Sequence, residues 1–194
     1  MNLPNFLTLL RVLLTFSVAA LLFVDVQGFA TSAFVIYVFA GATDWFDGYI
    51  ARKYNIVTTF GKFMDALSDK IMVVAMFMTL FAINLFDSWT AFALVCAIIS
   101  MAREFYISGV RMIASKKGVV IAAETAGKYK AAAQMVSLGA IICAFALRND
   151  FGQIQTPLYN FAFYLGIVLL GVSTLLSIYS AVSYSVKYSN LLKE

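Results

Sequence analysis

Four aspartates lie within 26 residues of a mostly apolar chain, and they are its strongest candidates for chemistry: Asp44, Asp47, Asp65 and Asp69. Within each pair the spacing is three or four residues, so in a helix each pair shares one face. Carboxylates beside membrane-spanning segments are typical of a metal site or an ion path. Four of them close together repel one another unless cations neutralise them. We therefore expect a four-carboxylate pocket with bound metal.

The residue types of the chain limit both the metal and the chemistry. There is no histidine, which removes the commonest proton shuttle and the commonest transition-metal ligand. Cys96 and Cys143 lie inside apolar runs, where we expect them to pack as core residues. Oxygen ligands alone favour a hard ion such as Mg²⁺, Mn²⁺ or Ca²⁺. Two such ions a few Å apart can clamp the attacking and leaving oxygens of a phosphoryl transfer.

Composition predicts an all-α, polytopic membrane protein that positions these aspartates. Of 194 residues, 62% are hydrophobic and 12% charged, and the uncharged runs are long enough for bilayer spans. No linker or charge block divides the chain, so we expect a single domain over residues 1–194. The first apolar run follows Pro4 and Asn5, a typical helix entry, and we expect a retained span rather than a signal peptide.

We expect a bundle of six transmembrane helices whose polar ends continue as helix into the membrane interface. The predicted spans are roughly Phe6–Phe23, Gly28–Thr43, Met64–Leu85, Trp89–Ile107, Lys130–Leu147 and Pro157–Tyr184.

The basic residues predict the orientation of these spans. Eleven of the 14 Lys and Arg residues fall on the side that holds the N-terminus. The positive-inside rule then places both termini in the cytoplasm. Arg11 and Lys70 lie within spans toward the same end. All four aspartates would lie at the cytoplasmic ends of the second and third spans, which a loop of about a dozen residues joins as antiparallel neighbours. The predicted site therefore faces the cytoplasmic side of the cell membrane.

The pattern D-x2-D-G-x2-A-R-x8-G-x3-D-x3-D runs from Asp44 to Asp69. It closely resembles the signature of the CDP-alcohol phosphotransferase family of membrane enzymes. The segment from Pro4 to Arg11 also looks like the N-terminal segment of this family, so the resemblance covers essentially the whole chain. It implies a centre of two metal ions, usually Mg²⁺ and alternatively Mn²⁺, that binds the diphosphate of a CDP-linked substrate.

The resemblance also implies a role for each motif position. The metal ligands would be Asp44, Asp47, Asp65 and Asp69, and Asp69 would also be the general base. The contacts to CDP would come from Asp44, Gly48, Ala51, Arg52 and Gly61. By residue type alone, Gly48 and Ala51 could equally serve close helix packing, and Arg52 could equally anchor its helix at the interface.

A basic region later in the chain bears on the second substrate. The stretches Arg103–Arg111 and Gly127–Lys130 resemble the branch of the family that transfers the phosphatidyl group of CDP-diacylglycerol to glycerol 3-phosphate. A doubly anionic acceptor needs cations, and the expected phosphate-binding residues are Arg103, Arg111 and Lys128. Alternatively, Arg103 and Glu104 form a buried pair that orients the site rather than binding substrate.

Other functions stay open at this stage. The same chemistry could use another acceptor: inositol phosphate, serine or phosphatidylglycerol. A divalent-metal transporter would also use intramembrane carboxylates, but it would carry acids in several spans rather than at one end of one helix pair. The expected partners are the two substrates, membrane lipid and a second copy of the chain, since homodimers are usual in the family. No nucleic-acid partner is expected.

Overall fold

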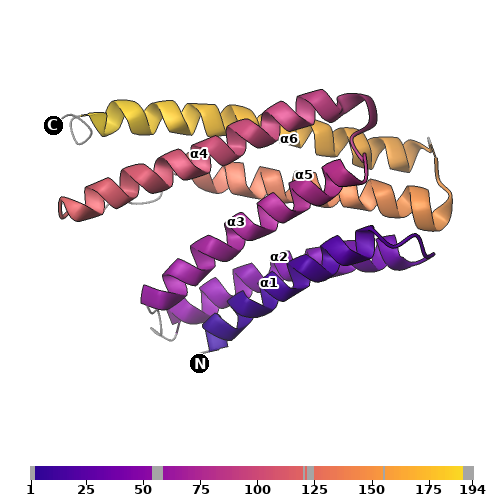
Figure 1. Cartoon of the computed structure of the whole chain (residues 1–194), viewed down its shortest axis with the longest axis horizontal. Helices are drawn as coiled ribbons and strands as arrows, with labels where there is room; N and C mark the ends of the chain where they lie inside the picture. Colours follow the sequence, from indigo (N-terminus) through magenta and orange to yellow (C-terminus); the bar gives the residue numbers. More distant parts are fainter. Residues whose placement is uncertain (1–2, 54–58, 120, 122–124, 155, 190–194) are drawn as a thin grey trace. The chain divides into compact units, whose positions relative to one another are not determined.

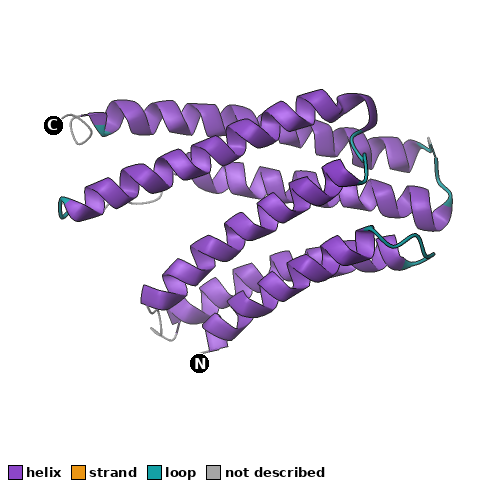
Figure 2. Cartoon of the chain, viewed as in Figure 1, coloured by secondary structure: helices purple, strands orange, loops and turns teal. Residues whose placement is uncertain are grey.

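The computed structural model describes residues 3–53, 59–119, 121, 125–154 and 156–189, and it describes side chains in these ranges except those of 3–5, 44–53, 59–60 and 62. Every regular element in these ranges is helical (Figure 2), as the sequence predicts. The elements are α1 (Leu3–Leu22), α2 (Phe29–Lys53), α3 (Thr59–Ala82), the 3-10 turn η1 (Asp87–Trp89), α4 (Thr90–Lys116), α5 (Thr125–Phe151) and α6 (Pro157–Lys187).

Three of these helical segments are long and apolar enough to cross a membrane: Asp87–Lys116, Thr125–Phe151 and Pro157–Lys187. Two shorter apolar helical stretches, Phe6–Leu22 and Phe29–Thr43, lie in α1 and α2. The chain is therefore a helical membrane protein. That all six predicted segments span the bilayer, with both termini in the cytoplasm, stays a prediction.

The polar ends of the predicted spans continue as helix, as expected. α2 continues past Thr43 to Lys53, and α4 continues past Ile107 to Lys116. An α-helix satisfies its own backbone polar groups, so extending it through the interface avoids unpaired amides near the lipid. The predicted loop of a dozen residues between the motif halves is correspondingly shorter. Residues 54–58, between α2 and α3, lie outside the described part of the chain.

The chain divides into two compact units, and the predicted single domain stays a prediction. Unit 1 comprises Met1–Phe86 and Leu138–Tyr164, and unit 2 comprises Asp87–Ser137 and Leu165–Glu194. Both units draw on α5 and α6, because the boundary falls within each of these helices.

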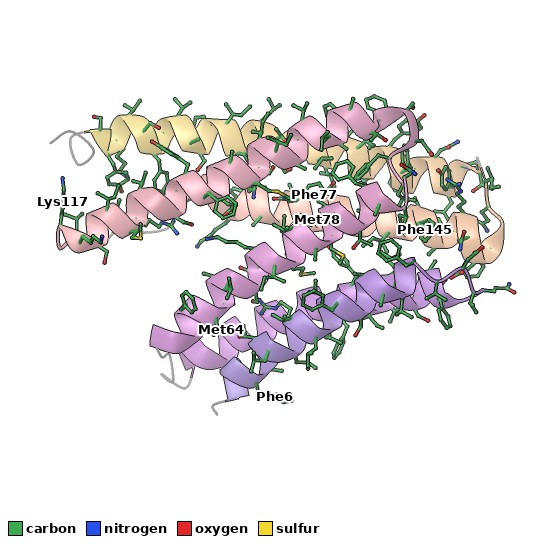
Figure 3. The ribbon with its side chains drawn as sticks, viewed as in Figure 1. Phe6, Met64, Phe77, Met78, Lys117 and Phe145 are labelled. Carbon is green, nitrogen blue, oxygen red and sulfur yellow. The ribbon has the colours of Figure 1, made fainter. Side chains whose placement is uncertain are left out.

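In unit 1, α1 packs against both α2 and α3 (Figure 1). Small residues of α2 make close packing possible, since Ala33 and Ala40 are buried on the same face as Tyr37. Gly139 of α5 lies against Tyr37, because a Cβ at this glycine would be 3.1 Å from Cε1 of the ring. Phe77 and Met78 of α3, both labelled in Figure 3, differ in exposure: Phe77 is fully buried and Met78 is 65% exposed. One face of α3 therefore contributes to the core of unit 1.

In unit 2, α5 and α6 carry several buried polar residues in addition to apolar ones. The hydroxyls of Ser173 and Ser177 donate to carbonyls of their own helix, Leu170 and Ser173, at 2.8 and 2.9 Å. Ser137 of α5 instead donates to the Gly166 carbonyl of α6 at 2.7 Å and so joins the two helices. Polar side chains inside a membrane protein commonly connect helices in this way.

Asp150, near the end of α5, caps the N-terminus of α2. Its carboxylate accepts hydrogen bonds from the backbone amides of Gly28, at 2.9 Å, and Thr31, at 2.6 Å, and from the Thr31 hydroxyl at 2.5 Å. Gly28 has a φ of 91°, which favours glycine, and it has no side chain to cap the helix itself. A carboxylate from a distant helix therefore satisfies the first amides of α2, where a negative charge also suits the helix dipole.

Replacing Asp150 with alanine should leave these amides unpaired and lower the free energy of unfolding by about 1–2 kcal/mol. Thermal unfolding of the detergent-solubilised protein would measure the loss. Asp25→Ala is the matched control, because Asp25 is exposed and accepts only a 3.4 Å hydrogen bond from Asn149. Equal losses for the two variants would contradict the capping role.

Candidate active site

The two halves of the aspartate motif lie on two helices of unit 1. The segment from Asp44 to Arg52 belongs to α2, and the segment from Gly61 to Asp69 belongs to α3. The side chains from position 44 to position 53 are outside the described residues, so the predicted roles of Asp44, Asp47, Gly48, Ala51 and Arg52 stay predictions.

Asp65 and Asp69 share one face of α3, as their spacing predicts. Each places its Oδ1 atom near the same nitrogen, Nη1 of Arg11, at 3.4 Å and 2.9 Å respectively. Their side chains are 51% and 56% exposed, so neither carboxylate is enclosed by the protein. Two acids held on one side by a common cation and open on the other form one half of the predicted pocket. That Asp44 and Asp47 complete it stays a prediction.

Arg11 of α1 is the residue that holds the two aspartates, and the sequence analysis assigned it no role. Its side chain is completely buried, and Nη1 also donates to Ser68 Oγ at 3.1 Å. Ser68 in turn donates to the backbone carbonyl of Asp65 at 3.0 Å. A buried guanidinium is costly unless it is paired and hydrogen-bonded, and the contacts of Nη1 offset part of that cost. The available signal was a single arginine inside an apolar run, which favours a functional partner within the membrane.

The described side chains of this site supply some, but not all, of the ligands that a hard divalent cation needs. Among the side chains with described positions, no group of three or more His, Cys, Asp or Glu residues could hold a metal ion. Asp65 and Asp69 do supply exposed carboxylate oxygens on adjacent turns, the ligand type that Mg²⁺ prefers. The aspartates of α2 would have to provide the remaining ligands.

A second charged cluster lies in unit 2. Glu104 of α4 accepts hydrogen bonds at the same atom, Oε1, from Arg103 Nη1 at 3.1 Å and from Lys130 Nζ of α5 at 2.8 Å. Arg103 also donates through Nη2 to the hydroxyl of Ser180 on α6, at 2.6 Å. Arg103 and Glu104 therefore pair with each other, although Glu104 is 32% exposed, and that the pair orients the site stays a prediction. Lys130, buried in this cluster, was expected as a cytoplasmic basic residue and as part of the stretch Gly127–Lys130, with no role of its own.

Gly127 of α5 lies beside this cluster. A Cβ at Gly127 would lie 3.2 Å from Nη2 of Arg103, the same nitrogen that donates to Ser180. A side chain at position 127 would require this nitrogen to shift by a few tenths of an ångström.

The other two expected phosphate-binding residues lie apart from Glu104. Arg111 donates through Nη2 to the hydroxyl of Tyr184 at 2.9 Å, and its guanidinium carbon lies 5.7 Å from the centre of that ring. Lys128 is exposed on α5. The three residues therefore belong to one unit. Arg103 is largely buried, Arg111 lies over the ring of Tyr184, and Lys128 is exposed. Their role in binding substrate stays a prediction.

The fold and the site define a helical membrane protein with an acidic site on α3 and a cationic cluster between α4 and α5. The sequence pattern of the family described as CDP-alcohol phosphatidyltransferase matches residues 1–180. The chain belongs to this family, whose members generally depend on divalent metal.

Several curated bacterial proteins are similar to the chain, and each carries the name CDP-diacylglycerol--glycerol-3-phosphate 3-phosphatidyltransferase. The protein of Haemophilus influenzae is 35% identical over 187 residues, which cover 94% of this chain and 91% of that protein. The protein of Bacillus subtilis is 35% identical over 140 residues, covering 72% and 67%. The protein of Shigella flexneri is 33% identical over 185 residues, covering 94% and 92%.

Glu104→Gln keeps the shape of the side chain but removes the charge that Arg103 and Lys130 share. The buried ammonium of Lys130 then has no counter-charge at this position. We expect the free energy of unfolding to fall by about 1–3 kcal/mol, less than the ~3–5 kcal/mol of a fully buried pair, because Glu104 is 32% exposed. Thermal unfolding in detergent is the measurement.

The companion variant combines Glu104→Gln with Lys130→Met, which removes both charges and keeps a long side chain. It should recover most of the lost stability. A double variant no more stable than Glu104→Gln would show that the single change does not act through Lys130.

Proposed function

We propose that this chain transfers the phosphatidyl group from CDP-diacylglycerol to glycerol 3-phosphate, giving phosphatidylglycerol phosphate and CMP. The observation that carries the proposal is the complete aspartate motif from Asp44 to Asp69, in a chain that matches the family over residues 1–180. The names of the relatives supply the donor and the acceptor, and the Haemophilus influenzae relative aligns over nearly the whole chain. This activity is a step of phospholipid synthesis.

In this proposal the acidic site holds two divalent cations, Mg²⁺ or Mn²⁺. The ligands are Asp44, Asp47, Asp65 and Asp69, and the residues near CDP are Asp44, Gly48, Ala51, Arg52 and Gly61. When bound, the ions supply electrophilic stabilisation of the charge on the transferring phosphoryl group. Arg11 holds one oxygen of Asp65 and one of Asp69, which restricts their rotamers and leaves the carboxylates facing the ligand side.

The reaction is a displacement at the phosphorus that carries the diacylglycerol. The acceptor hydroxyl oxygen forms a new bond to this phosphorus, and the bond from the same phosphorus to the bridging oxygen of CMP breaks. Asp69, more than half exposed, accepts the proton of the acceptor hydroxyl. CMP leaves with the electron pair of the broken bond, so charge and atoms balance.

The acceptor phosphate would bind to cations of unit 2. Arg103 and Arg111 are arginines of α4 whose guanidinium groups are already oriented by Ser180 and Tyr184. Prior orientation reduces the entropy lost when an arginine binds phosphate. Lys128 would add a third charge. This supports glycerol 3-phosphate over serine, which has no phosphate group, whereas inositol phosphate would use the same cations.

The proposed setting is the cell membrane, with six spans, both termini in the cytoplasm and the site on the cytoplasmic side. The distribution of Lys and Arg supports this orientation. The soluble acceptor and CMP would exchange with the cytoplasm, and the acyl chains of the donor would stay in the lipid. A homodimer is part of the proposal on family resemblance alone.

Purified protein with CDP-diacylglycerol and Mg²⁺ should release CMP fastest when glycerol 3-phosphate is the acceptor. The panel includes inositol phosphate, serine and phosphatidylglycerol. Asp69→Asn should lower the rate by roughly 10²–10⁴-fold, since it removes the general base. Asp25→Asn, an exposed aspartate outside the motif, is the control and should retain full activity. A faster rate with another acceptor would reassign the substrate, and full activity of Asp69→Asn would refute the mechanism.

Arg11→Gln should lower the rate of CMP release roughly 10–100-fold, the usual effect of losing a residue that orients metal ligands. The folded variant should also need more Mg²⁺ for half-maximal rate, which a general loss of stability would not cause. Arg11→Lys keeps the charge and should restore part of the activity. An Arg11→Gln protein that is folded and has the wild-type Mg²⁺ dependence would contradict the positioning role.

A further inference from the structure

Unit 2 contains buried polar atoms with no hydrogen-bond partner among the described residues. They are the hydroxyl of Ser100, both side-chain amide atoms of Gln134 and the Nε atom of Arg103. Ser100 is 0% exposed and Gln134 is 1% exposed. A buried polar group left unsatisfied loses its hydrogen bonds to water without replacement, and native proteins rarely accept this loss.

Helix geometry places Ser100 and Gln134 at the same level of unit 2. The hydrogen bond from Lys130 to Glu104 fixes the register of α5 against α4, and Figure 1 shows these two helices running in opposite directions. Ser100 precedes Glu104 by one turn, and Gln134 follows Lys130 by one turn. In an antiparallel pair, one turn back on the first helix and one turn forward on the second reach the same level. The guanidinium of Arg103 instead lies near Gly127, on the other side of Lys130 from Gln134.

The Ser100 hydroxyl also differs from other buried serines of the unit. Ser173 and Ser177 satisfy their hydroxyls on carbonyls of their own helix. The same type of bond is open to any serine inside a helix. Ser100 does not make it, so its hydroxyl is available to a molecule at this level.

We propose that Ser100 and Gln134 line an internal site that holds ordered water. The chemistry of the two side chains selects this ligand. An amide and a hydroxyl each donate and accept. Water can accept from the amide nitrogen while it donates to the hydroxyl, or accept from the hydroxyl while it donates to the amide oxygen. A cation would face the N–H donors, and an anion would face the amide oxygen.

This water joins α4 to α5 one turn from the Glu104–Lys130 pair. It provides two to four hydrogen bonds to groups that the protein does not satisfy, as buried waters commonly do. Polar molecules at this position also lower the cost of keeping the Lys130 ammonium charged among apolar helices. The inference does not depend on the substrate, because none of its steps uses the transferase activity.

The first test is a double-variant cycle with Ser100→Ala and Gln134→Leu, read as the melting temperature in detergent. Each single change should lower the melting temperature by about 2–4 °C, because the water loses a partner. The double variant should lose less than the sum of the two, since the groups share one ligand. Ser173→Ala with Gln134→Leu is the control pair and should be additive, because the Ser173 hydroxyl bonds to its own helix.

Two results would overturn the proposal. A melting temperature that is unchanged or raised by Gln134→Leu would show that the amide is unsatisfied and the site dry. Additive losses for Ser100→Ala and Gln134→Leu would show that no ligand is shared.

The second test uses the unmodified protein, so it does not depend on variants that fold. Solid-state NMR of the protein in deuterated lipid nanodiscs should show polarisation transfer from water to the side-chain amide protons of Gln134. If no water lies near this amide, no polarisation transfer will be seen. That result would refute the site.

Discussion

The ion pairs of Arg11 constrain the rest of unit 1. A guanidinium with no exposure to solvent is tolerated only where carboxylates and hydroxyls reach it, and here Asp65, Ser68 and Asp69 of α3 do so. This requirement sets how α1 lies along α3. It also joins the two acids that the helix spacing places on one face of α3. The packing of two helices and the formation of the acidic site are therefore consequences of the same contact.

The charged cluster of unit 2 must also be neutralised inside the protein, but there the signs of the charges are reversed. In unit 1 one cation serves two acids, and in unit 2 one acid, Glu104, serves the two cations Arg103 and Lys130. Counting only these ion pairs, the first cluster has one acid more than it has cations, and the second has one cation more than it has acids. These signs suit the proposed ligands, a metal ion at the acids and a phosphate at the cations. Incomplete neutralisation inside a membrane protein is costly, and it is typical of sites that bind charged ligands.

The fold was predictable from sequence wherever one local period decides the structure. Apolar runs predicted the helices, and the charged residues at their ends predicted that α2 and α4 would extend beyond the apolar part. The spacing of Asp65 and Asp69 predicted their shared face, which the common contact to Arg11 confirms. In contrast, the cap that Asp150 provides for α2 has no local signal, because its partners lie more than a hundred residues earlier in the chain.

By itself, the sequence determined the chemistry available to this protein: a motif of carboxylates with small residues and one arginine, no histidine, and apolar helices to carry them. It also determined the family, because motif spacing is a property of the chain. Only the tertiary structure decided that Arg11 joins Asp65 and Asp69, that Lys130 joins Glu104, and that the side chains of Ser100 and Gln134 find no hydrogen-bond partner in the described part of the chain. The physical reason is that a charge or an amide in an apolar bundle must find its partner on another helix. Which residue that is depends on how the helices pack.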